Sequence, residues 1–190
     1  MPLVVDKKKI SREIIEAFQK CVREKPITKV TMRDVAEQAG ISHPKILYYF
    51  KNRDELLIAY AKYMTELYSL FFKEWVERAK ADPFLKNEPT EAISKMIEEI
   101  AEFDEVKHTG AYEQLYALSL YQPEIAEAIH NAYTEWRKDL REILRELYGR
   151  EMDDMVNAIL VLIEGVLLCT MNGELKNEKV SNLLYLYKQL

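Results

Sequence analysis

The chain has 190 residues, enough for one domain with a good core or for a small domain joined to a larger one. Six Pro, five Gly and few β-branched runs favour an all-α fold. The two cysteines, Cys21 and Cys169, lie in apolar helical settings, which favours free buried thiols in a reducing compartment over a disulfide or a redox switch. The formal net charge of −5 argues at first against a nucleic-acid partner.

The N-terminal residues do not read as a secretion signal. Pro2 to Val5 is too short for the apolar part of a signal peptide, and Lys7 to Lys9 follow it directly. The longest apolar run, Ala158 to Met171, is interrupted by Glu164 and falls short of the ~20 residues that a bilayer span needs. We therefore expect a soluble, cytoplasmic protein with no membrane partner.

Two short helices and the start of a third are predicted between Thr31 and Leu57. Thr31 and Asp34 match a capping box, so a helix should begin at Met32, and Gly40 can take the left-handed conformation that ends it. Ser42 is a good N-cap for the next helix, from about His43 to Tyr49, with Pro44 tolerated in its first turn. Asn52 with Glu55 caps the third helix.

The second of these helices should display His43, Lys45, Tyr48 and Tyr49, and bury Ile46, Leu47 or Phe50. Two helices joined by a short Gly-containing turn are typical of the helix-turn-helix motif, whose second helix enters the major groove of DNA. The alternative is a helical hairpin buried in an all-α domain. A purely structural helix would not usually display Lys and two Tyr beside Lys51 and Arg53.

At these residues the sequence resembles the TetR family of transcriptional regulators, over about Ile10 to Leu57 and without insertions. Three positions depart from the family pattern. Pro26 stands where Gly is usual, Val22 where Phe is usual, and Leu47 where a phosphate-binding Tyr is frequent. Leu47 cannot donate a hydrogen bond, so anchoring on the DNA backbone should depend more on Tyr48 and Tyr49.

We predict that His43 and Lys45 contact base edges, and that Tyr48 contacts a thymine methyl or a phosphate. The resemblance implies that Thr31, Tyr49, Lys51 and Arg53 hold the DNA backbone. The complete predicted DNA-binding set is Thr31, Ser42, His43, Pro44, Lys45, Tyr48, Tyr49, Lys51 and Arg53.

The distribution of charge removes the objection raised by the net charge. Residues 1–53 contain 12 Lys and Arg against 6 Asp and Glu, a charge of +6, and the remaining residues carry −11. This asymmetry favours a DNA-facing head, residues 1–53, on an acidic body, residues 54–190. The basic residues Lys7, Lys8, Lys9 and Arg12 either contact DNA or form a solvated arm.

The body should be a helical bundle, giving nine or ten helices in total. The spacing predicts helices over about 53–80, 90–106 with Thr90 as cap, 112–121, 123–148 and 152–172, and a last one over Lys179 to Leu190. Many of the body's aromatic residues must be ordinary core, but such a bundle can also hold an apolar ligand between its helices. The predicted pocket residues are Tyr63, Phe71, Phe103, His108, Tyr112, Tyr116 and Glu164. As a carboxylate in an apolar run, Glu164 either pairs across a dimer or faces a cavity.

The two long helices, 123–148 and 152–172, are predicted to pair with their copies as a four-helix bundle about a two-fold axis. The alternative is that the more apolar helix is buried inside a monomer. The predicted interface comprises Ile129, Tyr133, Trp136, Leu140, Ile159, Ile163 and Val166.

No catalytic, metal or cofactor motif is present in the sequence, so we expect no enzyme. The sequence instead predicts a homodimeric regulator, a repressor, that binds a near-palindromic DNA operator and releases it when a hydrophobic small molecule fills the body. The alternative is an architectural or adaptor protein of the same fold that binds DNA without a small-molecule effector.

Overall fold

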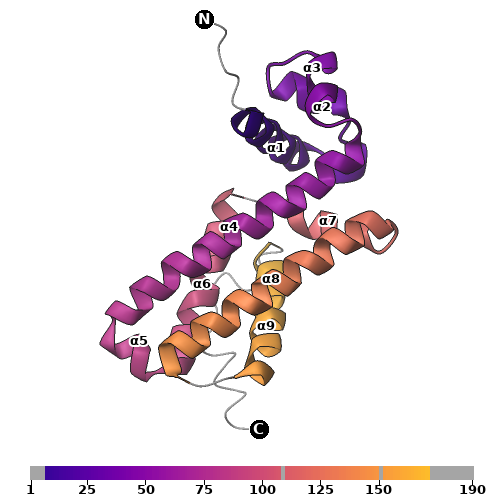
Figure 1. Cartoon of the computed structure of the whole chain (residues 1–190). Coiled ribbons are helices and arrows are strands. Elements are labelled where there is room, and N and C mark those ends of the chain that lie inside the picture. Colours follow the sequence, from indigo (N-terminus) through magenta and orange to yellow (C-terminus); the bar gives the residue numbers. More distant parts are fainter. Residues whose placement is uncertain (1–6, 108–109, 150–151, 172–190) are drawn as a thin grey trace, which may run out of the picture. The chain divides into compact units, whose positions relative to one another are not determined.

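The computed structural model describes residues 7–107, 110–149 and 152–171, with side chains 104–107 left aside (Figure 1). Over these residues the chain forms α-helices and one short 3-10 helix, with no strand, which confirms the predicted all-α fold. The chain divides into two compact units. The first comprises Met1–Glu66 and Gly110–Ala132, and the second comprises Leu67–Thr109 and Tyr133–Leu190, as far as these ranges are described.

In the first unit, α1 (Lys7–Glu24), α2 (Met32–Gln38) and α3 (His43–Tyr49) pack on one another. The predicted capping box at α2 is present, since the Asp34 N–H donates to the Thr31 hydroxyl and the Asp34 carboxylate accepts from the Thr31 N–H at 2.7 Å. Gly40 has φ 64° in the turn, and the Ser42 hydroxyl accepts from the Lys45 N–H at the start of α3. The sequence therefore predicted each boundary of this motif correctly.

The 3-10 helix η1 (Ile27–Lys29) is held by side chains from two other elements. Arg53, the first residue of α4 (Arg53–Ala81), donates to the carbonyl oxygens of Ile27 (2.6 Å) and Val30 (3.1 Å). Gln114, in α7 (Ala111–Ser119), accepts the Ile27 N–H at 2.8 Å. Both polar groups of the Ile27 backbone are thus satisfied by side chains. The first unit includes segments beyond the predicted head, and the division at residue 53 stays a prediction about function.

The second unit contains the C-terminal part of α4, then α5 (Pro83–Asn87) and α6 (Pro89–Lys107). The sequence predicts only a break where α5 lies. Asp82 starts α5 by accepting the N–H groups of Phe84 (2.9 Å) and Leu85 (3.5 Å). The predicted cap at Thr90 is wrong by two residues, because α6 begins at Pro89 and the Glu88 carbonyl already accepts the Ala92 N–H.

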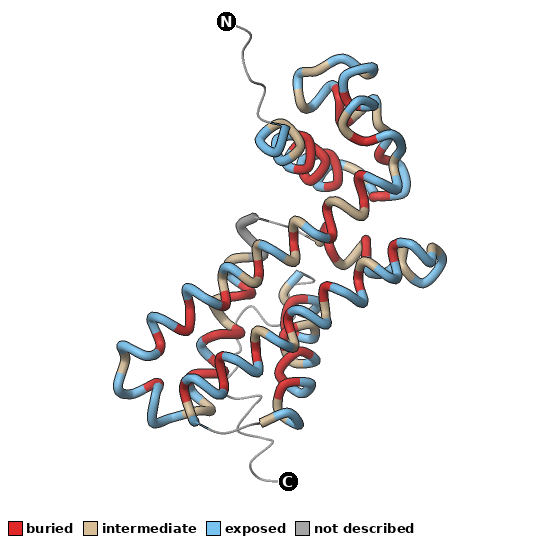
Figure 2. The backbone as a smooth tube through the Cα atoms, viewed as in Figure 1, coloured by how far each residue is buried: buried red, intermediate tan, exposed pale blue. Residues whose placement is uncertain are grey.

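The unit is completed by the C-terminal part of α8 (Pro123–Tyr148) and by α9 (Asp153–Met171), which packs against α6. By length and hydropathy α9 could cross a membrane, but the core helix of a soluble protein satisfies the same criterion. Six apolar side chains of α9 are buried within the chain (Figure 2). The predicted helix over Lys179 to Leu190 lies outside the described residues.

Candidate functional site

Helix α3 has a buried apolar side and an opposite side with polar and aromatic residues. Ile46 and Phe50 are buried, and they fix the helix against the rest of the first unit. Lys45 is exposed, Tyr48 is 72% exposed, and His43 is half-buried at the first position of the helix. This arrangement gives α3 one side that packs and one side that can enter a groove.

The remaining predicted contacts of α3 differ in exposure. Tyr49 is half-buried, with its ring 5.2 Å from the Tyr48 ring in an edge-to-face arrangement. Of the three residues expected to supply the buried side of α3, Ile46 and Phe50 are buried and Leu47 is 37% exposed. An exposed Leu at this position leaves Tyr48 and Tyr49 as the hydroxyl donors of the helix. Ser42 and Pro44 are both exposed.

Lys7 is not in the predicted DNA-binding set, although it belongs to the basic residues that either contact DNA or form a solvated arm. In the structure its Nζ lies over the Tyr48 ring, 5.7 Å from the ring centroid. This contact brings the first turn of α1 to the exposed side of α3. Sequence alone could not reveal it, because 41 residues separate the two side chains.

Three residues predicted to hold the DNA backbone have different settings. Lys51 is exposed. The Thr31 hydroxyl lies 2.7 Å from the Asp34 carboxylate and accepts the Asp34 N–H, so it serves the capping box. Arg53 is half-buried, and its guanidinium already bonds to two carbonyls of the η1 segment. Burial lowers the pKa of Arg53 from its ordinary value.

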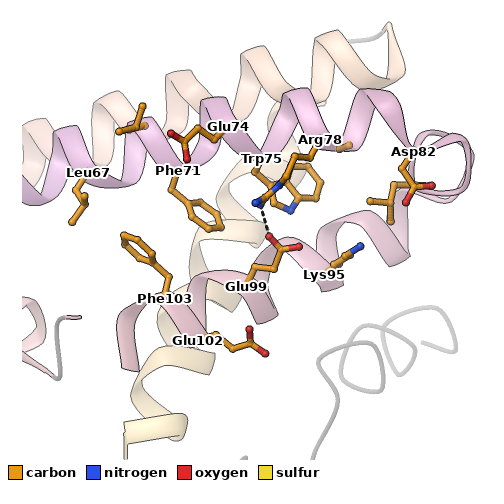
Figure 3. Close-up of a pocket in the computed structure, with 13 residues that line it drawn as sticks. Leu67, Phe71, Glu74, Trp75, Arg78, Asp82, Lys95, Glu99, Glu102 and Phe103 are labelled. Atoms are coloured by element: carbon orange, nitrogen blue, oxygen red, sulfur yellow. Dashed lines mark hydrogen bonds and ion pairs between the residues drawn. The ribbon is translucent and has the colours of Figure 1, made fainter. Parts of the chain in front are cut away.

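A cleft of about 1020 Å³ lies between α4 and α6 in the second unit (Figure 3). Its apolar lining consists mainly of Leu67, Leu70, Phe71, Trp75, Leu85 and Phe103. Its charged lining consists of Glu74, Arg78, Asp82, Lys95, Glu99 and Glu102. The Arg78 guanidinium and the Glu99 carboxylate form an ion pair between the two helices at 2.5 Å. We refer to this site as the α4–α6 cleft; its volume suits a drug-sized molecule.

Residues 14–60 match the sequence profile of the bacterial regulatory proteins of the tetR family. This segment contains the capping box, the Gly40 turn and α3. The match covers the N-terminal helix-turn-helix segment of the chain. Members of this family are DNA-binding transcription factors rather than enzymes.

Solved structures share the fold of this protein over most of the chain. A TetR transcription regulator from Haloarcula marismortui matches with a TM-score of 0.71 and 16% identity, covering 95% of this chain and 96% of its own. The fatty acid degradation regulator FadR from Bacillus halodurans matches with a TM-score of 0.65 and 16% identity, covering 95% and 93%. GusR from Salmonella enterica matches with a TM-score of 0.66 and 15% identity, covering 95% and 94%. No curated protein matches the sequence.

The predicted pocket residues belong to both units, and their role in ligand binding stays a prediction. Phe71 and Phe103 line the α4–α6 cleft, with ring centroids 5.6 Å apart. Tyr63, Tyr112 and Tyr116 belong to the first unit instead, and Tyr63 lies beside Arg12 there. Glu164 accepts a hydrogen bond from the Tyr133 hydroxyl at 2.5 Å within the second unit. His108 lies outside the described residues.

The predicted dimer interface is largely buried within this chain, and its role in dimer formation stays a prediction. Six of its seven residues are core residues of this chain, each 6% exposed or less, and so offer little surface to a second chain: Ile129, Trp136, Leu140, Ile159, Ile163 and Val166. Tyr133 is half-buried. The apolar side chains that α9 does expose are on another stripe, with Val161 at 71% and Leu168 at 54%. An apolar stripe in the sequence predicts that one face of a helix is buried. It does not show whether the same chain or a second chain covers that face.

The described residues hold no cluster of three or more His, Cys, Asp or Glu able to bind a metal. The described side chains form a basic and aromatic helix face in the first unit and an amphipathic cleft in the second.

Proposed function

We propose that this protein is a ligand-responsive repressor of the TetR family that binds a near-palindromic operator as a homodimer. The observation that carries the DNA-binding part is the exposed face of α3, with Lys45 and Tyr48 free to approach base edges while Ile46 and Phe50 anchor the helix. The charge of +6 on residues 1–53 supplies the attraction to phosphates. The cellular location consistent with this function is the cytoplasm.

The α4–α6 cleft is the proposed effector site. It favours a ligand-responsive regulator over an adaptor protein, because an adaptor has no need of such a cleft. α6 is joined by only two residues, 108 and 109, to the Gly110–Ala132 segment of the first unit. That segment contains Gln114, which holds Ile27 beside the helix-turn-helix motif.

A molecule bound in the cleft stabilises the arrangement of α4 and α6 for which it has the higher affinity. The segments attached to these two helices then take the arrangement that accompanies it. Operator affinity then falls by no more than the ligand's difference in affinity between the two arrangements.

A second copy is proposed to pack on the exposed stripe of α9, formed by Ala158, Val161, Gly165, Leu168 and Met171. A Cβ added at Gly165 meets no atom of the chain within 4 Å, which leaves room for close approach of another helix. Two heads related by a two-fold axis can engage half-sites about 34 Å apart.

The test is operator selection followed by quantitative binding of wild type and Lys45→Ala. Lys45→Ala should weaken the selected operator by about 1–3 kcal/mol and relax the base preference at one position of each half-site. Gln38→Ala, an exposed and uncharged change at the end of α2 outside the predicted DNA-binding set, serves as the control for general damage to the helix-turn-helix motif. Equal binding of Lys45→Ala across all operator variants would contradict the assignment of Lys45 to base readout.

A further inference from the structure

Resting on the function proposed above, we propose that the α4–α6 cleft selects a lipophilic organic cation as its effector. The sequence predicts only a hydrophobic molecule. The charges and aromatic rings of the cleft specify the class further.

One end of the cleft is apolar and aromatic. Phe71 of α4 and Phe103 of α6 point toward one another across it, with ring centroids 5.6 Å apart and planes tilted by 47° (Figure 3). Both residues are only half-buried, and Leu70 beside them is 53% exposed. An apolar molecule bound here would remove this surface from water, which is favourable in proportion to the area covered.

The cleft as a whole is acidic, with four carboxylates against two basic groups. Two of the carboxylates already have partners: Glu99 pairs with Arg78, and Asp82 accepts two backbone N–H groups at the start of α5. Within the part of the chain that the structure describes, Glu74 and Glu102 have no ion-pair partner. Negative charge is therefore left over in the cleft.

These two carboxylates belong to the aromatic end. Glu74 follows Phe71 by one helical turn on α4, and Glu102 directly precedes Phe103 on α6. Lys95 lies toward the other end, two helical turns before Glu102. A cation near the Phe71–Phe103 pair would be attracted both by the carboxylates and by the faces of the rings.

An organic anion is disfavoured at the same place. It would meet Glu74 and Glu102, and the nearest guanidinium, that of Arg78, is already neutralised by Glu99. To use Arg78, an anion would have to displace that carboxylate. The sign of the charge is therefore the property by which this cleft should discriminate between ligands of equal size.

Tetraphenylphosphonium and tetraphenylborate form a matched pair of probes, because they have nearly the same size and shape and opposite charge. Titration of each into the full chain by isothermal calorimetry should give at least tenfold tighter binding of the phosphonium. Phe71→Ala should weaken both probes, because both use the aromatic wall.

Charge variants separate the cleft from the general acidity of the body. Glu74→Gln and Glu102→Gln should each weaken phosphonium binding by about two- to fivefold, as expected for partly exposed charges, and leave borate binding equal or tighter. Glu91→Gln removes the same charge from an exposed position of α6 outside the cleft, and should change neither affinity. Melting curves of all three variants verify that each is folded.

The proposal is overturned if borate binds as tightly as phosphonium, if phosphonium does not bind, or if Glu91→Gln weakens phosphonium as much as the two cleft variants do. Operator binding is measured separately in the presence of each probe. Selective phosphonium binding without operator release would refute the effector role and leave the ligand class standing. Absence of any operator complex would refute the DNA-binding function, and the calorimetric titrations would still decide the class of ligand.

Discussion

Arg53, a predicted DNA contact, also holds the fold of the head together. The family resemblance implied a backbone contact at this position, yet the guanidinium bonds to the carbonyls of Ile27 and Val30. A planar group with several donors suits two carbonyls at different angles better than an ammonium does. A functional role for Arg53 was therefore predictable from the sequence. Its hydrogen-bond partners were not, because they lie more than twenty positions away in the sequence.

Arg53→Ala should lower the free energy of unfolding of the protein by about 1–3 kcal/mol, because two carbonyls lose a charged donor. Arg53→Lys should recover only part of this stability, since Lys cannot reach both carbonyls with a fixed fork. Thermal melting measures the loss, and the salt dependence of operator binding tests the other role. The relevant quantity is the slope of the logarithm of operator affinity against the logarithm of salt concentration. If Arg53→Ala reduces the magnitude of this slope by about one, the residue also contacts a phosphate.

Asp34 joins two interactions on one carboxylate. It caps α2 and lies 2.7 Å from the Lys25 ammonium. The Lys25 ammonium, followed by the hydrogen bonds from the Thr31 hydroxyl and N–H, holds the pKa of Asp34 at about 2, against an ordinary value of 3.8. A depressed pKa means that the ionised carboxylate is stabilised in the folded state.

This shift gives a pH-dependent prediction. The contribution of Asp34 to stability is fully present above about pH 4, and it is lost as the pH falls through about 2. Asp34→Asn should therefore melt at a lower temperature than wild type at pH 6, and the gap should close between pH 4 and pH 2. A gap of constant size down to pH 2 would show that the charge of Asp34 does not stabilise the fold.

At the scale of elements, the sequence was most informative where local rules decide. The caps at Thr31, Ser42 and Asn52 predicted the starts of α2, α3 and α4, and the structure contains the corresponding hydrogen bonds. Helix α5 was missed because five residues between two prolines carry no periodic pattern. Which elements pack together was harder to predict, because the sequence of an apolar helix face does not identify the element that packs on it.

Helix α7 is the clearest case. Its aromatic residues Tyr112 and Tyr116 were predicted to line a pocket, but α7 packs against α1 and η1 in the first unit. Gln114, in the same helix, accepts the Ile27 N–H. Helix α7 thus forms part of the support of the head.

Gln114→Ala should remove that support. The Ile27 N–H would lose its partner, and the amide of Ile27 should exchange with solvent faster by about five- to tenfold, the equivalent of roughly 1 kcal/mol. Gln114→Glu keeps an acceptor oxygen at the same reach and should restore slow exchange. Hydrogen exchange at Ile27, followed in all three proteins, checks both expectations. Unchanged exchange in Gln114→Ala would contradict a supporting role for this bond.

At the scale of the whole molecule, the all-α fold class was predictable from the sequence, and the division of α9 into a buried and an exposed stripe was not. Ile159, Ile163 and Val166 were predicted to face a second chain and are buried in their own. The hydrophobic pattern of α9 extends nearly all round the helix, so it could not separate the inner stripe from the outer one. Only the packing of α6 against α9 makes that distinction.

Val161→Lys tests the outer stripe of α9. Val161 is 71% exposed, so the substitution should leave the fold of each chain intact and place a charge in the proposed contact. Light scattering coupled to size exclusion should then change from two chains per particle to one. Operator affinity should fall by at least tenfold, because two linked heads bind more tightly than one. Phe84→Lys, at another exposed apolar residue of the second unit, should alter neither property.

The contact of Lys7 with the Tyr48 ring has a practical side. A fluorophore attached at position 7 would lie beside the exposed face of α3, where an arriving duplex would restrict its tumbling. Protein labelled there should report operator docking directly through fluorescence anisotropy. A bulky label at the same position would compete with the duplex for that space, so a small one is the better choice.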